Sequence, residues 1–243
     1  MIIVLMRKNQ VSTILPILAA NEATTHILFM YNNAAGFNEI VRSLGRGWAS
    51  IGFPGAGGTL DGPVVCCGLI PQQPTTLGEL DGGVTVRLKQ IESVFEKAGF
   101  PTVISRQMDA WLKTHVAFIT SVADALYMVD CNNYALAKTP DGVPLMVRGV
   151  REGFRVLRKL GVTVTPLKLR VLFEWLPFSV PVAYWRNYLN SSMGDYFLAR
   201  HTRAASEEIQ ELAGEFRILI GKADIPTPAL GRLYRYVDKP GVG

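Results

Sequence analysis

The chain has 243 residues, of which 49% are hydrophobic and 19% charged, with a formal net charge of +5. This composition excludes intrinsic disorder, and the length suffices for two domains of ordinary size. No apolar run reaches the ~20 residues of a membrane-spanning helix, so a membrane protein is not expected. The lysines and arginines are scattered among acidic residues without a basic tract, which argues against nucleic acid as a partner.

The three cysteines are an adjacent pair, Cys66 and Cys67, and the distant Cys131. Their number and spacing fit neither a disulfide framework nor a CxxC metal clip. The apolar stretch at residues 1–23 carries its positive charges after its first apolar run, whereas a secretory signal carries them before it. We therefore expect a protein of the reducing cytoplasm.

The first part of the chain alternates strand and helix patterns. Its apolar, β-branched runs at residues 2–6 and 26–32 are typical of buried parallel strands, and further strands are predicted at 48–53 and 101–105. Residues 63–70 and 75–80 have the pattern of strands at a sheet edge or in a hairpin. Helical spacing predicts helices at residues 11–20 and 85–98, the second ended by Gly99. The glycine-rich stretch at 52–58 matches no phosphate-loop motif and is interpreted as a flexible or tightly turned connection between strands. These patterns indicate an α/β unit.

From Asp109 onward the pattern changes to long helical periods interrupted by prolines, without a convincing strand. Ser206, followed by two acidic residues, has the features of a helix start, and Asp109 has those of a helix cap. We predict an all-helical second unit, so that the chain divides into residues 1–107 and 108–243.

The helix that begins near Asp109 carries Lys113 just past its first turn. On a helix, Lys113 shares one face with four small or polar residues, which are Ala117, Thr120, Ser121 and Asp124. Such a stripe suits a cleft in which a ligand lies along the helix, but it is also typical of an ordinary solvated face. In a cleft, the ammonium could stabilise the charge that develops on a carbonyl oxygen, donate a proton to it, or form a Schiff base.

Polar side chains follow the first two predicted strands. Asn33 comes after the second strand, at the edge where open parallel sheets bind ligands, although with Gly36 it could form a tight turn. Arg7 and Lys8 follow the first strand, where they would meet a phosphate or face water. Ser192 is a candidate helix cap or a ligand for a carboxylate. The three histidines lack metal-site spacing and no GxSxG elbow occurs, so neither a metal centre nor Ser-His hydrolysis is expected.

Six segments carry a family resemblance: "MRKNQ", "YNNAAG", "TTLGELDGG", "FEKAGF", "ISRQMDAWLKTHVAFITSVADALY" and "SSM". Their order and spacing resemble the ketopantoate reductases, or 2-dehydropantoate 2-reductases, over almost the whole chain. The resemblance implies an incomplete Rossmann-type parallel sheet domain that binds NADPH, at residues 1–107. It implies an all-helical C-terminal domain for substrate binding and dimerisation, at residues 108–243. The implied activity is hydride transfer to a 2-oxo acid or related ketone, as from ketopantoate to pantoate in pantothenate biosynthesis, by a homodimer.

The same resemblance implies roles for individual residues. The family's catalytic lysine falls on Lys113, as general acid and electrostatic partner of the developing alkoxide. Its asparagine near the nicotinamide falls on Asn33, and its substrate-binding serine falls on Ser192. Its basic cofactor-binding residue falls on Arg7, with Lys8 beside it.

The sequence also departs from the family. Ala117 and Ser121 stand where the family has two asparagines, so a substrate other than ketopantoate is expected, with Ser121 kept as a substrate-binding candidate. The family's acidic residue falls on Ala204 without a gap, or on Glu208 if a helical turn is inserted. The glycine-rich turn that opens the family's cofactor domain does not occur in this sequence. The alternative is therefore a non-enzymatic module that dimerises or binds a small ligand.

Overall fold

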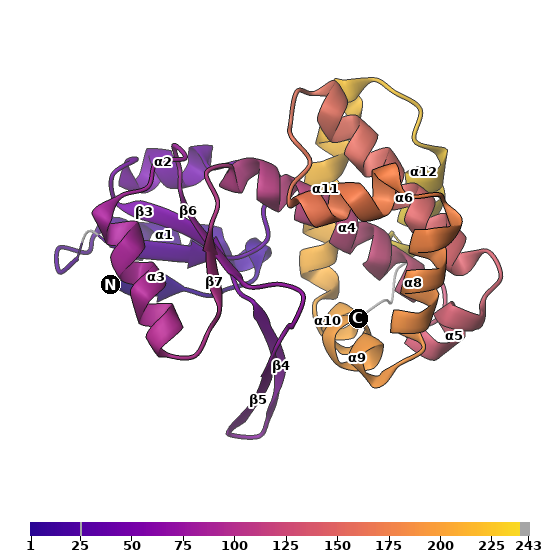
Figure 1. Ribbon diagram of the computed structural model, residues 1–243. Coiled ribbons are helices and arrows are strands. Elements are labelled where there is room, and N and C mark those ends of the chain that lie inside the picture. The colour runs from indigo at the N-terminus through magenta and orange to yellow at the C-terminus, as the bar shows by residue number, and fades with distance from the viewer. Residues whose placement is uncertain (25, 239–243) are drawn as a thin grey trace. The chain divides into compact units, whose positions relative to one another are not determined.

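The computed structural model describes residues 1–24 and 26–238, and the side chains of all of these except residues 59–61. The chain divides into two compact units, unit 1 at Met1–Leu112 and unit 2 at Lys113–Gly243 (Figure 1). Our sequence-based boundary followed residue 107. Unit 1 is an α/β structure with a mainly parallel sheet, and unit 2 is helical, so the predicted fold class is confirmed.

Unit 1 is built on a five-stranded sheet of order β1-β2-β3-β6-β7. Its strands are β1 (Ile2–Val4), β2 (Ile27–Met30), β3 (Ala49–Phe53), β6 (Thr75–Glu79) and β7 (Thr102–Ile104). The first three are parallel, β6 runs antiparallel to β3, and β7 is parallel to β6. The carboxyl end of β6 therefore lies beside the start of β3, away from the edge where β1, β2 and β3 end.

Helices cover both faces of this sheet. They are α1 (Val11–Ala19), which follows the short turn η1 (Lys8–Gln10), α2 (Asn38–Leu44) and α3 (Val86–Lys97). Alternate residues of β2 point to opposite faces, so Phe29 packs in one core with α1 and α2 while Leu28 packs in the other with α3. The hydroxyl of Thr85 caps α3 by accepting a hydrogen bond from the Leu88 backbone N–H at 3.2 Å.

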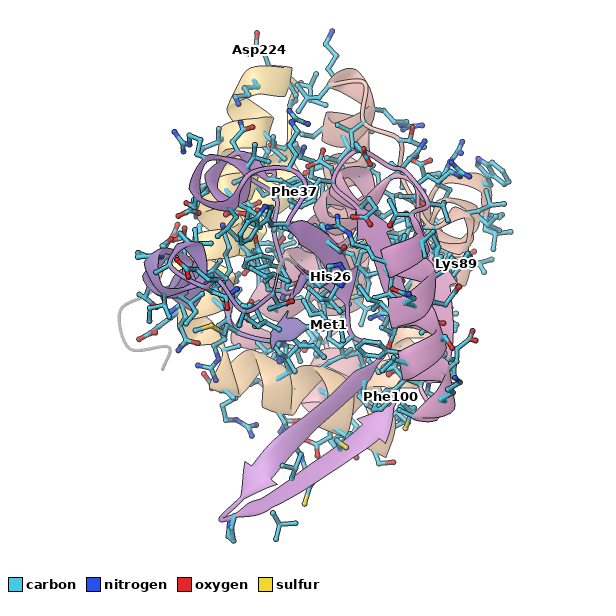
Figure 2. All side chains as sticks on the ribbon, turned by 90° about the vertical axis from the view of Figure 1, so that its left-hand side faces the viewer. Met1, His26, Phe37, Lys89, Phe100 and Asp224 are labelled. Atoms are coloured by element: carbon cyan, nitrogen blue, oxygen red, sulfur yellow. The ribbon has the colours of Figure 1, made fainter. Side chains whose placement is uncertain are left out.

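A separate two-stranded ribbon extends away from the main sheet (Figures 1 and 2). It consists of β4 (Ala56–Asp61) and β5 (Val64–Leu69). The expectation of a turned connection in the glycine-rich stretch is therefore wrong for its second half, which forms β4. The pairing of β4 with β5 requires glycine at position 58, because a Cβ there would overlap the carbonyl oxygen of Cys66 on the paired strand.

Unit 2 contains helices throughout, and its described residues form no strand. Helix α4 (Met108–Tyr127) begins in unit 1 and continues into unit 2. The others are α5 (Asn133–Lys138), α6 (Gly142–Lys159), α7 (Leu167–Arg170), the π-helical turn η2 (Val171–Trp175), α8 (Ser179–Leu189), α9 (Ser192–Gly194), the π-helical turn η3 (Asp195–Ala199), α10 (Arg200–Ala204), α11 (Ser206–Ala223) and α12 (Pro228–Val237). None of the helices in the described ranges is long and apolar enough to cross a membrane.

Two helices begin earlier than their expected caps require, α4 by two residues and α11 by one. Helix α4 starts at Met108, so Asp109 lies in its first turn rather than at its cap. Helix α11 has Ala205 as its N-cap and Ser206 as its first residue. The acidic residues of both first turns still interact favourably with the positive end of the helix dipole.

The small-residue stripe of α4 is packed against α6. All four stripe residues after Lys113 are fully buried. A Cβ on Gly153 would lie 2.9 Å from the Ala117 Cβ, and one on Gly149 would lie 3.1 Å from the Ser121 Oγ. The Ser121 hydroxyl donates to the Ala117 carbonyl oxygen at 2.9 Å. The stripe from Ala117 onward is therefore a helix-packing surface, and both the cleft and the solvated face are wrong for it.

This packing predicts opposite effects for two glycine-to-alanine substitutions. Gly153→Ala should lower the free energy of unfolding by ~1–3 kcal/mol, because the added methyl meets the rigid Cβ of Ala117. Gly214→Ala on α11 should raise it by ~0.5–1 kcal/mol, because a Cβ there meets nothing within 4 Å and alanine favours a helix. Urea denaturation measures both, and a stabilising Gly153→Ala would contradict the close approach of α4 and α6.

Candidate active site

A basic edge lies where β1 and β2 end. Lys8, just after β1, places its Nζ 5.6 Å from the ring centroid of Tyr31, just after β2. The two residues meet because adjacent parallel strands end at the same edge of the sheet. Arg7 precedes Lys8 and is exposed to solvent. The two cations can therefore bind an anionic group such as a phosphate.

Asn33 shapes the turn that follows β2. Its side chain is 2% exposed, its Nδ2 donates to the Gly36 carbonyl oxygen at 2.8 Å, and its Oδ1 accepts from the Ala35 N–H at 3.1 Å. Gly36 has a φ of +84°, a conformation that glycine adopts without strain. The tight-turn alternative is thus present in the structure. A turn fixed in this way also gives the amide a defined position at the edge that carries Lys8.

Lys113 is partly buried and is held by a well-anchored helix. The start of α4 packs in a core of unit 1, where the Trp111 ring lies 5.0 Å from that of Phe53. Leu112, the residue before the lysine, is 1% exposed in the same core. The backbone of Lys113 is therefore fixed by a regular helix, which suits a group that must meet a substrate in one geometry.

The other site candidates of unit 2 lie on separate helices. Ser192 is the exposed first residue of α9, but the cap is Ser191, whose hydroxyl accepts from the Gly194 N–H at 3.4 Å. The cap interpretation of Ser192 is therefore wrong. Glu208 lies in the first turn of α11 and is 3% exposed. Ser121, beneath α6, is the candidate whose hydroxyl is enclosed within the helical core.

His115, two residues after Lys113, is neutral at physiological pH. Burial of the imidazole, and then the nearby positive charge of His201, lower the pKa of His115 to about 3. A histidine with this pKa carries no proton to donate near pH 7. Among the described residues, no three His, Cys, Asp or Glu side chains are grouped as a metal site requires.

Comparison with known proteins gives one relative in sequence and several in structure. No family model matches the chain. A 93-residue segment is 33% identical to the 2-dehydropantoate 2-reductase of Halobacterium salinarum, covering 37% of this chain and 30% of that protein. D-mandelate dehydrogenase in complex with NADH superimposes with a TM-score of 0.71 at 16% identity, covering 97% of this chain and 76% of that one. A dimeric ketopantoate reductase from Staphylococcus aureus superimposes with a TM-score of 0.68 at 12% identity, covering 97% and 75%.

The chain has the ketopantoate reductase fold. The resemblance seen in the motifs is thereby confirmed, by sequence over one segment and by structure over nearly the whole chain. The matched segment spans less than a third of the length of the Halobacterium relative.

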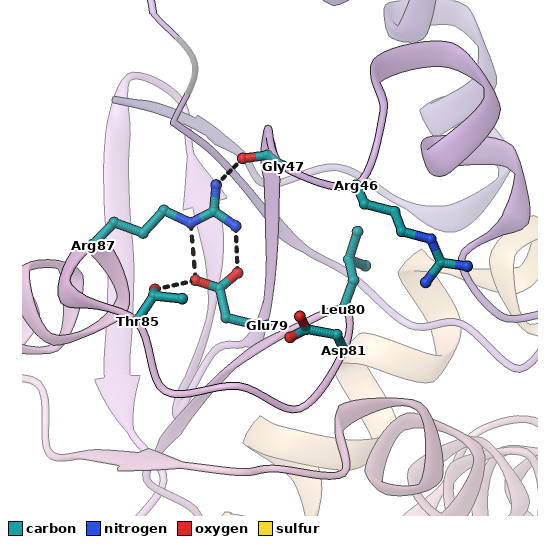
Figure 3. A pocket seen from close by; sticks show the side chains of 7 residues that line it. All are labelled: Arg46, Gly47, Glu79, Leu80, Asp81, Thr85 and Arg87. Carbon is teal, nitrogen blue, oxygen red and sulfur yellow. Dashed lines mark hydrogen bonds and ion pairs between the residues drawn. The ribbon is translucent and has the colours of Figure 1, made fainter.

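This ketopantoate reductase fold carries a pocket that the sequence did not reveal. Its volume is about 280 Å³, and it is lined by Arg46, Gly47, Glu79, Leu80, Asp81, Thr85 and Arg87 (Figure 3). Glu79 is the last residue of β6 and pairs in register with Ser50 near the start of β3. The pocket therefore lies at the end of the sheet opposite to Lys8 and Tyr31.

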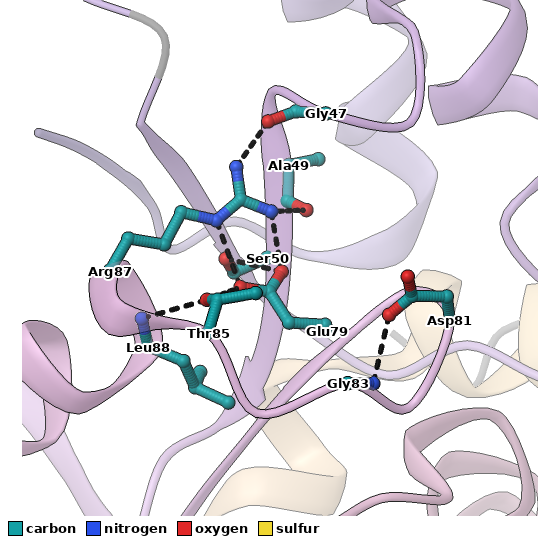
Figure 4. A network of polar contacts seen from close by, with 9 residues as sticks. All are labelled: Gly47, Ala49, Ser50, Glu79, Asp81, Gly83, Thr85, Arg87 and Leu88. Atoms are coloured by element: carbon teal, nitrogen blue, oxygen red, sulfur yellow. Dashed lines mark hydrogen bonds and ion pairs between the residues drawn. The ribbon is translucent and has the colours of Figure 1, made fainter.

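A buried carboxylate organises this pocket (Figure 4). Glu79 is 3% exposed and accepts hydrogen bonds from Ser50 Oγ at 3.0 Å and Thr85 Oγ1 at 2.5 Å. Arg87 donates two further hydrogen bonds to this carboxylate, from Nε at 2.9 Å and from Nη2 at 2.5 Å. Burial alone would raise the pKa of Glu79, but the hydrogen bonds from Arg87 and Thr85 outweigh it and lower the pKa.

The same arginine ties three segments of unit 1 together. Arg87, in the first turn of α3, also donates to the carbonyl oxygens of Gly47 and Ala49, at the start of β3. The charges of Glu79 and Arg87 are thus satisfied by each other and by the surrounding backbone. We interpret the cluster as a structural clamp. The "GEL" segment, which contains Glu79, was recognised in the sequence, whereas the pairing of Arg87 with Glu79 was not predicted.

Asp124 is a buried acid in the helical unit. It is 0% exposed, and neither carboxylate oxygen has a hydrogen-bond partner among the described residues. Burial raises the pKa of Asp124 well above its usual value, and the charge of Arg217 on α11 offsets this only in part. Tyr234 of α12 is 6% exposed, and the charge of Asp124 contributes to raising its pKa. The carboxyl of Asp124 is thus more easily protonated in the folded protein.

Removing this acid should make unit 2 more stable at neutral pH. Because folding raises the pKa of Asp124, the contribution of its carboxyl to stability is fully present below the unfolded pKa of 3.8 and is lost as the pH rises towards the folded pKa. Asp124→Asn should therefore raise the free energy of unfolding at pH 7, with an advantage that shrinks by up to ~1.4 kcal/mol per unit as pH falls to 4. Urea denaturation between pH 4 and 8 measures this, with Glu211→Gln on the exposed side of α11 as control. An advantage independent of pH would contradict the raised pKa.

Proposed function

We propose that this chain belongs to a nicotinamide-dependent reductase of a 2-oxo acid or a related ketone. The observation that carries the proposal is the basic strand edge of Lys8 and Tyr31 within a ketopantoate reductase fold. D-mandelate dehydrogenase, which shares this fold, binds NADH together with anilino(oxo)acetate, a carboxylate with an oxo group on the neighbouring carbon. The proposed substrate shares this arrangement of a carboxylate beside a carbonyl, although the carbonyl of anilino(oxo)acetate belongs to an amide and that of the substrate to a ketone.

The residues at the basic edge fit parts of NADPH. Arg7 and Lys8 suit the extra phosphate that distinguishes NADPH from NADH, because both are cationic and follow a parallel strand. Asn33 is proposed to act on the nicotinamide end from the same edge, through the turn that its buried amide holds in place. The described residues include no strand, glycine turn and helix of the kind that holds a pyrophosphate on helix N-terminal amides. The fit therefore covers the two ends of the cofactor and not its middle.

The proposed chemistry uses residues of the helical unit. When bound, NADPH supplies a hydride to the keto carbon of the substrate. The ammonium of Lys113 donates the proton that the carbonyl oxygen needs to become a hydroxyl, and it stabilises the negative charge before that transfer. Ser192 and Glu208 are proposed to bind polar groups of the substrate. Ser121 has no role in this scheme, because α6 covers it.

We also propose a homodimer. Strand β1 lies at an edge of the main sheet, and Ile3 and Leu5 are 47% and 64% exposed. An edge strand with apolar side chains pairs readily with another chain. Sedimentation at micromolar concentrations should give the mass of a dimer, and a strict monomer would contradict this proposal.

Calorimetry with NADPH tests the proposed function. We expect a dissociation constant in the ~1–100 μM range, and oxidation of bound NADPH when a 2-oxo acid is added. The double substitution Arg7→Ala and Lys8→Ala should weaken the binding of NADPH more than the binding of NADH, because only NADPH carries the extra phosphate. If neither cofactor binds, the reductase is overturned in favour of a non-enzymatic dimerising or ligand-binding module.

A further inference from the structure

The positive charge of the chain is concentrated in one segment of the helical unit. Residues 142–189, from α6 to α8, contain eight lysines and arginines and two acidic residues, for a net charge of +6. This exceeds the +5 of the whole chain, so the remaining residues together carry −1. The scatter expected from the sequence therefore does not hold for this segment.

Helix α6 arranges four of these charges as a stripe. Its arginines follow one another at intervals of three, four and three residues, which places them on one helix face: Arg148, Arg151, Arg155 and Arg158. The side chains of Arg148, Arg155 and Arg158 are 50–54% exposed. The stripe therefore presents several guanidinium groups to its surroundings.

Two of the three acidic partners of the stripe are largely buried. Glu174 lies 3.4 Å from Arg158 and 3.9 Å from Arg170, and its side chain is only 7% exposed. Glu152 lies 3.7 Å from Arg155 and is 8% exposed. The third partner, Asp141, is 53% exposed and lies 3.2 Å from Arg148, so it offsets that arginine. The uncompensated positive charge of the outer surface therefore lies at Arg155, Arg158 and Arg170, whose carboxylate partners are buried.

An exposed apolar ridge adjoins the stripe. Trp175, Leu176, Val180 and Tyr184 are each at least 37% exposed, and Trp175 reaches 60%. The two features touch, because Arg151 Nη2 donates to the Leu176 carbonyl oxygen at 2.9 Å. We define the arginine–tryptophan face as the four arginines of α6 together with Arg170 and these four ridge residues.

We propose that the arginine–tryptophan face binds the surface of an anionic lipid bilayer. Guanidinium groups pair with lipid phosphates, while exposed tryptophan, leucine and tyrosine side chains favour the interface between headgroups and acyl chains. The guanidinium carbon of Arg170 lies 5.4 Å from the Trp175 ring centroid, so a cation and an aromatic ring are already held together. This binding is peripheral and needs no helix that crosses the membrane.

Charge and composition favour a bilayer over other occupants. A second copy that used the same face would bring two segments of +6 together, which is repulsive. A single-stranded nucleic acid would use stacking platforms, whereas Leu176 and Val180 offer neither an aromatic plane nor a hydrogen bond. A bilayer accommodates both the cations and the aliphatic side chains.

Vesicle co-sedimentation tests the proposal. The full chain should pellet with phosphatidylcholine vesicles that contain phosphatidylglycerol, should remain in solution with phosphatidylcholine alone, and should be released by 1 M salt. Arg155→Gln should weaken partitioning about fivefold, since one cation near such a surface contributes ~1 kcal/mol. Trp175→Ser should also weaken it, because the variant loses an exposed aromatic ring that favours the interface. Two matched controls lie outside the face, Ile218→Ser at an equally exposed apolar residue and Arg235→Gln, and both should bind as the wild type does.

Several outcomes would overturn the proposal. They are absence of binding to anionic vesicles, equal binding to neutral vesicles, and equal loss in the face variants and the controls. Loss of a dimer in Trp175→Ser would instead assign the ridge to a second copy, and binding of single-stranded RNA without binding of vesicles would assign the stripe to nucleic acid. Circular dichroism of each variant checks that it is folded.

Discussion

Lys113→Ala should lower kcat/KM for a 2-oxo acid by ~10²–10⁴-fold, with a change of less than about twofold in the dissociation constant of NADPH. The variant loses both the proton donor and the positive charge beside the developing alkoxide. These interactions become strong only as the carbonyl oxygen gains charge, so they affect turnover more than binding. Steady-state kinetics and calorimetry on the same preparation measure both quantities.

The control for Lys113 is a lysine with similar chemistry in another place. Lys138→Ala, at the exposed end of α5, should leave kcat/KM within about twofold of the wild type. Lys113→Arg keeps the charge but donates its proton poorly, so it should recover only part of the activity. Equal losses of cofactor binding and turnover in Lys113→Ala would mean that Lys113 takes no part in the chemical step.

Local patterns predicted the elements of this fold well. The alternation of apolar runs and helical periods predicted β1, β2, β3, β5, β6 and β7 and the helices α1 and α3, but not α2 or β4. The antiparallel placement of β6 beside β3 was beyond such reasoning, because a buried strand has the same pattern in either direction. This antiparallel direction places the Glu79 pocket at the end of the sheet opposite to the basic edge of Lys8 and Tyr31.

The site was harder to predict than the fold for a physical reason. A small polar stripe on α4 has the same pattern whether it faces a ligand, water or another helix. The residues that decide between these cases, Gly149 and Gly153, lie some thirty positions further along the chain on α6. Arg7, Lys8 and Asn33 were easier to place, because strand ends in a parallel sheet bring their following residues to one edge.

Glu79→Ala should lower the free energy of unfolding of unit 1 by ~3–5 kcal/mol, the cost of leaving one member of a buried ion pair without the other. Glu79 is 3% exposed and Arg87 16%, so water cannot replace the lost carboxylate fully. Glu92→Ala is the matched control, because Glu92 pairs with Lys89, whose side chain is 58% exposed, and such a pair contributes less than ~1 kcal/mol. Urea denaturation at pH 7 measures both, and similar small losses would contradict the clamp.

The pH dependence of the Glu79 variant gives an independent check on the clamp. A lowered folded pKa means that the stability from Glu79 is present above its unfolded value of 4.5 and is lost as pH falls through the folded pKa. The difference between wild type and Glu79→Ala should therefore be constant from pH 6 to 8 and should shrink below about pH 4.5. Because Arg87 also holds the backbone before β3, Arg87→Ala should be as destabilising, and the double variant should lose less than the sum. Additive losses would mean that Glu79 and Arg87 stabilise unit 1 separately.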